Sequence, residues 1–147
     1  MPEATAESFD EEGYFFTGDV VKRDSNTGRF TTLGRQSVDI IKTGGFKVSA
    51  LEVEATLQEL QMVSEVAVCG TPDDVYGERV CALVTLSEEA AKKENHPEEA
   101  IRTAAKERLA PQKVPSRVKV VNWVPRNNMG KVNKKEVKKE YFESDGQ

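Results

Sequence analysis

The chain of 147 residues is poor in the side chains that build metal and nucleophile sites, with one histidine, one tryptophan and two cysteines. Cys69 and Cys81 have no metal-ligand spacing, and His96 is the single imidazole. The sequence therefore argues against a zinc site and against a Cys–His nucleophile. Both cysteines fall in apolar, strand-like runs, so we expect buried and reduced thiols, as in an intracellular protein.

Long apolar runs are absent too. No stretch approaches the roughly 20 apolar residues that a membrane-spanning helix needs, so we expect no membrane span. The acidic start, MPEATAESFDEEGYFF, has neither the basic and apolar order of a secretory signal nor the arginine-rich character of a transit peptide. We expect an intracellular protein, and the sequence leaves open whether it is cytoplasmic or mitochondrial.

Charge is divided unevenly along the chain. Residues 102–139 hold 12 lysines and arginines and two acids, whereas the rest of the chain holds 9 basic and 23 acidic residues. A basic segment is typical of a protein with a polyanionic partner, but it also occurs as a solvated face. Nucleic-acid binding favours aromatic residues interleaved with the basic ones, and Trp123 is the only aromatic residue in this segment. We therefore predict no nucleic-acid partner and expect Trp123 to pack in the core.

Strand and helix patterns alternate from Ile40 onward in the order β-β-α-β-β-α-β-α. Ser49 and Glu52 form an S-x-x-E capping box, and Pro97 stands at the first position of a later helix. The predicted elements are a hairpin over 38–49, a helix from residue 49, strands over 63–70 and 78–86, a helix over 96–110, a strand over 116–125 and a helix over 133–141. This order predicts an α+β fold, a small sheet with helices packed on it.

The first 35 residues have a different pattern, made of extended segments with turns. The stretches GYFFTGDVVKRD and FTTLGR flank the turn DSNTGR and predict a hairpin. Since this piece is too small to bury a core of its own, we expect it to be the end of a larger domain. The predicted division is a β segment over 1–36, a hinge over 37–39, an α+β domain over 40–142 and a disordered tail over 143–147.

Two polar residues of this first segment follow glycines at strand ends. Asp19 comes after Gly18, and its carboxylate can accept two hydrogen bonds from a vicinal diol such as a ribose. Arg35 comes after Gly34 and can bond a ribose or a phosphate through its fork of donors. A strand-end turn and a surface arginine explain the same residues, and the spacing alone favours these plainer interpretations.

A pair of glycines, Gly44 and Gly45, interrupts a hairpin otherwise made of Ile, Val and Phe. Such a pair indicates positive φ angles or a ligand pressed against bare backbone. A type I′ turn explains it nearly as well. Lys42 and Lys47 flank the turn, where cationic side chains are more often solvated than functional.

Lys131 stands directly after a glycine in the loop PRNNMGKVNKK. A lysine on a mobile connection can stabilise the negative charge that develops on a phosphoryl or acyl-phosphate oxygen. Most lysines are solvated, however, and we expect the helically spaced residues Lys134, Lys135, Lys138 and Lys139 to form a largely solvated face.

Three motifs follow one another along the chain: GYFFTGD, then GRQSVDIIKTGGFKVSALEVE, then PRNNMGKVNKK. Their succession resembles the acyl-adenylate-forming enzymes, a family that includes acyl-CoA synthetases, firefly luciferases and peptide-synthetase adenylation domains. The resemblance runs from about Glu11 to Tyr141. The second and third motifs look most like those of malonyl-CoA synthetases.

The resemblance implies an ATP-dependent reaction in two steps. A carboxylate attacks the α-phosphate of Mg²⁺-bound ATP and releases pyrophosphate, and coenzyme A then displaces AMP to give a thioester. In this family a large N-terminal domain holds the acyl pocket and most contacts to ATP and Mg²⁺, and a small C-terminal domain swings about a hinge between the steps. Because the phosphate loop and acyl pocket lie upstream of these motifs, we expect this polypeptide alone to be inactive and its own N-terminal domain to be its partner.

The resemblance also implies roles for individual residues. Asp19 would bind the ribose hydroxyls, Arg35 would support the same ribose, and Lys131 would bridge carboxylate and phosphate oxygens during adenylation. For the thioester step, bare backbone at the glycine pair would admit the pantetheine arm, and the two lysines beside it would help to hold the phosphates of coenzyme A. These residues are Gly44, Gly45, Lys42 and Lys47.

Two matters stay open in the sequence. The family's hinge is usually an aspartate or lysine two residues after the arginine; that place is Ser37 here, and the segment is one residue longer, so the pivot is Ser37, Val38 or Asp39. The substrate is also open, since the same scaffold acts on other acids, such as fatty or coumarate-like acids. An alternative of another class is a free-standing basic module that binds RNA or an acidic partner.

Overall fold

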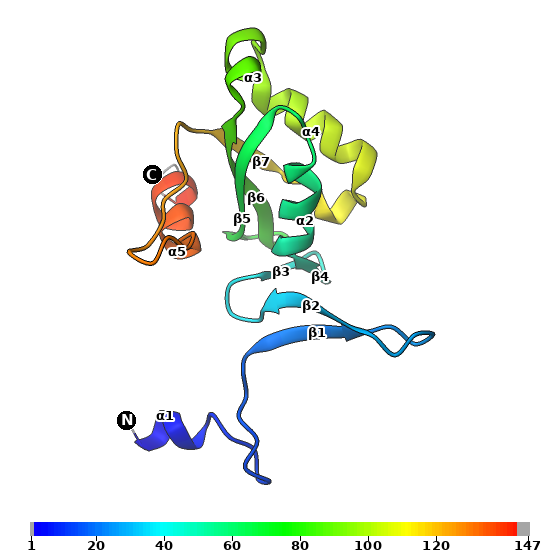
Figure 1. Ribbon diagram of the computed structural model, residues 1–147, viewed down its shortest axis with the longest axis vertical. Coiled ribbons are helices and arrows are strands. Elements are labelled where there is room, and N and C mark those ends of the chain that lie inside the picture. Colours follow the sequence, from blue (N-terminus) through cyan, green and yellow to red (C-terminus); the bar gives the residue numbers. More distant parts are fainter. Residues whose placement is uncertain (1, 144–147) are drawn as a thin grey trace.

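The computed structural model describes residues 2–143 and contains two sheets (Figure 1). The smaller sheet pairs β1 (Asp19–Arg23) with β2 (Phe30–Arg35) in antiparallel fashion. The larger sheet has the five strands β3 (Ile40–Thr43), β4 (Phe46–Ser49), β5 (Val63–Asp73), β6 (Gly77–Leu86) and β7 (Arg117–Val120). The helices are α1 (Pro2–Ala6), α2 (Ala50–Gln58), α3 (Glu88–Lys93), α4 (Pro97–Arg108) and α5 (Lys134–Lys138), with a 3-10 turn η1 (Pro111–Lys113) and a π-helical turn η2 (Lys139–Glu143).

Strand β6 is the centre of the larger sheet. It pairs in antiparallel fashion with β5 and β3 and in parallel fashion with β7. Helices α2 and α4 lie on one side of the sheet and α5 lies on the other (Figure 1). The predicted α+β fold, a small sheet with helices packed on it, is therefore confirmed.

Both faces of the β5–β6 ribbon are buried because each strand has an unbroken run of buried side chains, and successive side chains point to opposite faces. One face packs against α2 and α4, and its cluster includes Val68, Val80, Ala82, Leu57 and Ile101. The other face packs against α5 and η2, and its cluster includes Cys69, Cys81, Leu83, Val137 and Phe142. The sheet is thus the middle of three layers.

Local signals mark the helix ends, although the predicted capping box is seen in one half only, because the Glu52 carboxylate pairs with Lys113. Ser49 caps α2, and its Oγ accepts a hydrogen bond of 3.2 Å from the backbone N–H of Glu52. Pro97 occupies the first turn of α4. Asn133 caps α5 by accepting from the N–H of Glu136 at 3.3 Å. Each cap satisfies backbone donors that a helix leaves unpaired at its start.

The structure differs from the sequence-based expectations in several elements. Helices α1 and α3 were not predicted; α3 buries none of its residues, so no apolar periodicity marks it. Strand β5 continues to Asp73 and β6 begins at Gly77, beyond the expected bounds of 63–70 and 78–86, and β7 ends at Val120 rather than reaching residue 125. Glu143 is the last residue of η2, and the remainder of the predicted tail lies outside the described residues. Within 2–143, no helix has the length and apolar character needed to cross a membrane.

The prediction that Trp123 packs in the core is wrong. Its side chain is 62% exposed. Since β7 ends three residues earlier, the strict alternation of the strand is lost, and Val124 takes the buried position at 2% exposure.

The two cysteines are free and buried, as predicted. They form a cross-strand pair on the face covered by α5. Burial raises the pKa of the Cys69 thiol to about 12, and burial also raises the pKa of Cys81. A high pKa suppresses the thiolate, which is the reactive form of a thiol.

The two sheets meet at a close contact between Gly34 and Asp39. Gly34 has a φ of +120°, and a Cβ built there would lie 2.4 Å from the Cβ of Asp39. Asp39 is 8% exposed, and its Oδ2 accepts a hydrogen bond of 2.9 Å from the N–H of Arg35. Only glycine fits at position 34 without moving this carboxylate.

We expect both thiols to be unreactive toward a maleimide at neutral pH while the chain is folded. For Cys69, a rise of the pKa from 9.0 to about 12 lowers the thiolate fraction by about a thousandfold, and the covering helix blocks access as well. Mass spectrometry should show no adduct in buffer and two adducts in denaturant. Rapid labelling of the folded chain would contradict the packing of α5 on β5 and β6.

Substituting Gly34→Ala should lower the free energy of unfolding by more than Gly130→Ala does. Gly130 has a φ of +77° and nothing within 4 Å of a built Cβ, so its alanine variant carries backbone strain alone, about 1–2 kcal/mol. Gly34→Ala adds the clash with Asp39. Urea unfolding of both variants, followed by circular dichroism, checks this order. Equal losses of unfolding free energy would show that Asp39 moves aside at no cost.

Candidate functional site

The structure brings Asp19 and Arg35 together. They are register partners across β1 and β2, and Arg35 Nε lies 3.7 Å from Asp19 Oδ1. Gly18, with a φ of +76°, turns the chain into β1, and its carbonyl accepts from the N–H of Gln36. The side chains of Asp19 and Arg35 are 41% and 69% exposed. A carboxylate that accepts hydrogen bonds and a guanidinium that donates them therefore lie next to each other and are accessible to a ligand.

The glycine pair forms the two-residue turn between β3 and β4. Gly44 and Gly45 have φ angles of +55° and +84°, and the strands pair from Thr43 and Phe46 outward, as in a type I′ turn. The N–H of Gly44 donates to the carbonyl of Tyr76 at 2.9 Å. A Cβ at Gly44 would lie 3.3 Å from the Tyr76 ring, but a Cβ at Gly45 would meet nothing within 4 Å. Turn geometry thus explains both glycines, and Gly45 also leaves its backbone open.

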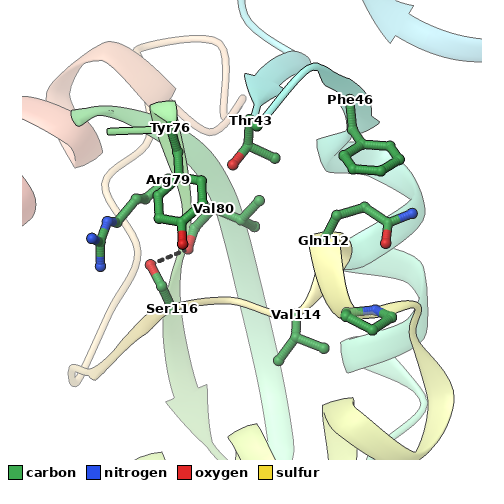
Figure 2. Close-up of a pocket in the computed structure, with 10 residues that line it drawn as sticks. Thr43, Phe46, Tyr76, Arg79, Val80, Gln112, Val114 and Ser116 are labelled. Carbon is green, nitrogen blue, oxygen red and sulfur yellow. Dashed lines mark hydrogen bonds between the residues drawn. The ribbon is translucent and has the colours of Figure 1, made fainter. Parts of the chain in front are cut away.

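A pocket of about 380 Å³ adjoins this turn. Figure 2 shows Phe46 and Gln112 on one side of it and Tyr76 on the other, with Thr43 above. Arg79 lines the pocket as well. Its guanidinium lies 5.5 Å from the centre of the Tyr76 ring and forms an ion pair with the carboxylate of Asp73. No sequence motif pointed to these residues; the one available signal was an aromatic residue, Tyr76, beside the turn glycine Gly77.

Lys42 and Lys47 lie away from this pocket. They are register partners on β3 and β4, and both are exposed. Since neighbouring residues on a strand point to opposite faces, these lysines face a different hollow of about 750 Å³, between the hairpin and β2, which Lys22 and Lys113 also line. The structure therefore separates the two lysines from the pocket beside the glycines and places them around a hollow with Lys22 and with Lys113, which is paired with the Glu52 carboxylate that also lines it.

Lys131 is exposed on a loop that is closed on itself. Its N–H donates to Asn127 Oδ1 at 3.0 Å, and its carbonyl accepts from the N–H of Asn127 at 2.7 Å. Arg126 donates to the carbonyl of Gly130 at 2.9 Å, and Asn133 N–H donates to the carbonyl that precedes Arg126. Within the described part of the chain, the recorded polar contacts of Lys131 are both backbone contacts. Its loop is braced rather than a mobile connection, and its ammonium is left available.

The expectation of a solvated face is wrong for Lys134. Its side chain is 13% exposed, and its Nζ lies 2.7 Å from Asp39 Oδ1 and 2.8 Å from Glu54 Oε1. Helical spacing alone did not reveal this, because both carboxylates are distant in sequence. The exposed neighbours Lys135 and Lys139 fit the expectation.

The basic segment of the chain pairs with an acidic one. Four of its cations contact carboxylates of α2, its C-terminal cap and β5. The pairs are Arg108–Glu59, Lys113–Glu52, Arg126–Glu65 and Lys134–Glu54. Part of the charge asymmetry seen in the sequence is therefore neutralised within the fold, which weakens the interpretation of a basic binding module.

The predicted site residues thus fall into separate groups. The pair of Asp19 and Arg35 lies on the smaller sheet, whereas the loop of Lys131 precedes α5 on the flank of the larger sheet (Figure 1). In the predicted hinge, Ser37 is exposed, Val38 is half-buried and Asp39 is buried. The structure thus brings Asp19 and Arg35 together but does not join Lys131 to them.

Comparisons with known proteins identify relatives of this chain. It is 49% identical over 146 residues to a malonate–CoA ligase of Arabidopsis thaliana, covering 95% of this chain and 24% of that protein. It is 48% identical over 135 residues to the mitochondrial malonate–CoA ligase ACSF3 of Homo sapiens, covering 91% of this chain and 22% of that protein. The crystal structure of ATP-bound MatB from Rhodopseudomonas palustris matches with a TM-score of 0.83 and 35% identity, covering 100% of this chain and 28% of that one. The chain thus spans about a quarter of the length of these relatives.

A family model covers most of the larger sheet and continues into the loop of Lys131, where the matched range ends. The model of the AMP-binding enzyme C-terminal domain matches residues 52–131, which is more than half of the 147 residues. The matched segment begins in α2 and includes β5, β6, α4 and β7. The chain belongs to the AMP-binding enzyme C-terminal domain family.

Proposed function

We propose that this chain forms the C-terminal part of an ATP-dependent acyl-CoA synthetase that activates malonate. The intact enzyme would join malonate to AMP, release pyrophosphate, and transfer the malonyl group to coenzyme A. The observation that carries the proposal is an exposed lysine on a braced loop, in a chain that is similar over nearly its whole length to malonate–CoA ligases. We further propose an intracellular location, in keeping with two free, buried cysteines.

In the adenylation step, Lys131 supplies a positive charge to the oxygens of the attacking carboxylate and the α-phosphate. A fixed cation stabilises charge that develops there in the transition state. Asp19 accepts hydrogen bonds from the ribose hydroxyls, and Arg35, its neighbour at 3.7 Å, donates to the same sugar. Since the lysine and this pair lie in separate groups, rotation about the hinge at 37–39 is needed to bring them to one nucleotide.

In the thioester step, the turn at Gly44 and Gly45 faces the pantetheine arm of coenzyme A. The open backbone at Gly45 and the adjoining pocket of about 380 Å³ suit a slender chain. Lys42 and Lys47 supply positive charge for the phosphates from the hollow that they share with Lys22; Lys113 lines the same hollow but is paired with Glu52.

The partner of this chain is the N-terminal domain of the same enzyme. Large apolar side chains of the first segment are left open: Tyr14 is 69% exposed, Phe15 60% and Phe16 59%. An apolar cluster of this kind is typical of a surface that packs against another domain.

For Mg²⁺, the described residues contain no group of three or more His, Cys, Asp or Glu side chains able to hold a metal, so we assign it no ligand in 2–143.

Replacing Lys131 by alanine in the intact enzyme should abolish most of the adenylation rate. Loss of one preorganised donor costs roughly 2.7–4 kcal/mol of transition-state stabilisation, or about 100- to 1,000-fold in rate. Malonate-dependent pyrophosphate exchange measures this step, and thioester formation from pre-made malonyl-AMP measures the other. The second step should be largely spared. Equal losses in both steps, or a similar loss in Lys135→Ala, would contradict the proposed role.

Malonate should support AMP formation by the intact enzyme far better than acetate or fatty acids. The three acids are compared at equal concentration, with AMP and acyl-CoA quantified by chromatography. Preference for a fatty or aryl acid would retain the scaffold and its lysine but refute malonate as the substrate. Binding of RNA by the chain, weakened by salt and accompanied by no synthetase activity of the intact protein, would refute the enzyme altogether.

A further inference from the structure

The three-residue ion cluster at Lys134 joins parts of the chain that are far apart in sequence. Lys134 Nζ lies between Asp39 Oδ1 at 2.7 Å and Glu54 Oε1 at 2.8 Å, and the three side chains are 13%, 12% and 18% exposed. Glu54 Oε1 also accepts from the N–H of Val68 on β5 at 2.8 Å. The cluster thus ties the start of α5 to the predicted hinge, to α2 and to the sheet.

Asp39 belongs firmly to the larger sheet. Its carbonyl accepts from the N–H of Ala50 at 2.7 Å, and its Oδ1 is held by Lys134. Three hydrogen bonds join this region to Arg35, on the far side of Ser37: Asp39 Oδ2 accepts from the N–H of Arg35, and the N–H groups of Asp39 and Val38 donate to its carbonyl at 2.8 and 3.3 Å. A further bond spans the same boundary, in which Ser49 Oγ donates to the carbonyl of Leu33 on β2 at 2.6 Å.

The loop of Lys131 is built on Lys134. The two lysines are three residues apart, and the intervening Asn133 is fixed at both ends: its N–H donates to Pro125 and its side chain caps α5. With Asn127 bracing the backbone of Lys131, the whole loop has one orientation relative to the start of α5. Whatever holds Lys134 therefore holds the base of the loop.

We propose that Lys134 is a positioning residue that locks the Lys131 loop to the hinge-side residue Asp39 and to Glu54, so that loop and sheet rotate as one body about Ser37 and Val38. The inference rests on the proposed function, since it assigns the part that aims the adenylation lysine. Rotation at Ser37 and Val38 breaks the hydrogen bonds to Arg35 and to the carbonyl of Leu33 on β2. It leaves both ion pairs of Lys134 intact, because Asp39 and Glu54 lie on the same side of the pivot. Lys134 touches no substrate.

Hydrogen exchange on the 147-residue chain tests the lock without any activity. In Lys134→Met, the hydrogen-bonded amides of Asn127, Lys131 and Asn133 should exchange about tenfold faster or more, while amides of β6 keep their protection. Lys134→Arg should restore the loop, since it keeps the charge. Lys135→Met is the matched control, an exposed lysine one residue away, and it should change nothing. Equal behaviour of Lys134→Met and Lys135→Met, or a rise shared equally by β6, overturns the proposal.

A charge-free triple variant covers the case in which Lys134→Met does not fold. Asp39→Asn, Glu54→Gln and Lys134→Met together remove the unpaired buried carboxylates that the single change leaves behind. Faster exchange confined to the loop supports the lock. Wild-type protection of the loop in this variant overturns it, because the ion pairs would then be dispensable.

Kinetics of the intact enzyme separate this proposal from the proposed function. In Lys134→Met, the kcat of malonate-dependent pyrophosphate exchange should fall about tenfold or more with the KM for ATP little changed, because the loop is misaimed while the ribose contacts remain. Thioester formation from pre-made malonyl-AMP should be spared, and Lys134→Arg should recover most of the rate. Unchanged kcat in Lys134→Met overturns the positioning role. If the wild-type enzyme activates no acid, the proposed function fails, and the exchange experiment still decides whether Lys134 locks the loop.

Discussion

The burial of the β5–β6 ribbon on both faces is the constraint on which the rest of the structure depends. A sheet with one apolar face can leave the other in water, but this ribbon places Val80 and Ala82 on one side and Cys81 and Leu83 on the other, all nearly inaccessible. Helices α2 and α4 satisfy one face only. The short helix α5 has to cover the second face, and Val137 anchors it there. The loop that carries Lys131 is thereby placed at the flank of the sheet by core packing.

Charge pairing supports the same arrangement, but it contributes less free energy than the packing of the core. The cations of the basic segment meet the acids of α2 and β5, so the C-terminal third of the chain folds back on the middle third. Most of these pairs are exposed, such as Arg108–Glu59 at 3.6 Å, and exposed pairs contribute about 0–1 kcal/mol each. The pairs of Lys134 differ, because this lysine is largely buried and an ammonium without its carboxylate partners would be destabilising there. They specify an orientation more than they add stability.

The sequence was sufficient where the signal is local and insufficient where it is not. Alternation, the cap at Ser49 and the paired turn glycines predicted the α+β order and the β3–β4 hairpin, because each depends on residues within a few positions of one another. The sequence also indicated Asp19 and Arg35 as candidate binding residues, each by itself. That they are neighbours follows only from the register of β1 and β2. It failed for Trp123 and Lys134, whose burial depends on where a strand ends and on carboxylates far away along the chain. The family resemblance, in contrast, supplied roles that no local pattern contains.

The closed loop around Lys131 means that the lysine changes position only if the body that carries it does. Asn127 bonds both backbone groups of Lys131, so extending the loop toward a distant nucleotide would sacrifice that bracing and the cap that follows. Four hydrogen bonds span the proposed pivot: three between Arg35 and the segment of Val38 and Asp39, and one from Ser49 to Leu33. A neutral bond contributes about 0.5–1.5 kcal/mol net and one to a carboxylate about 1.5–3 kcal/mol, because the freed groups can be solvated. The proposed rotation at the boundary between the two sheets would leave the bracing of Lys131 and the order of the larger sheet intact, whereas extension of the loop would not.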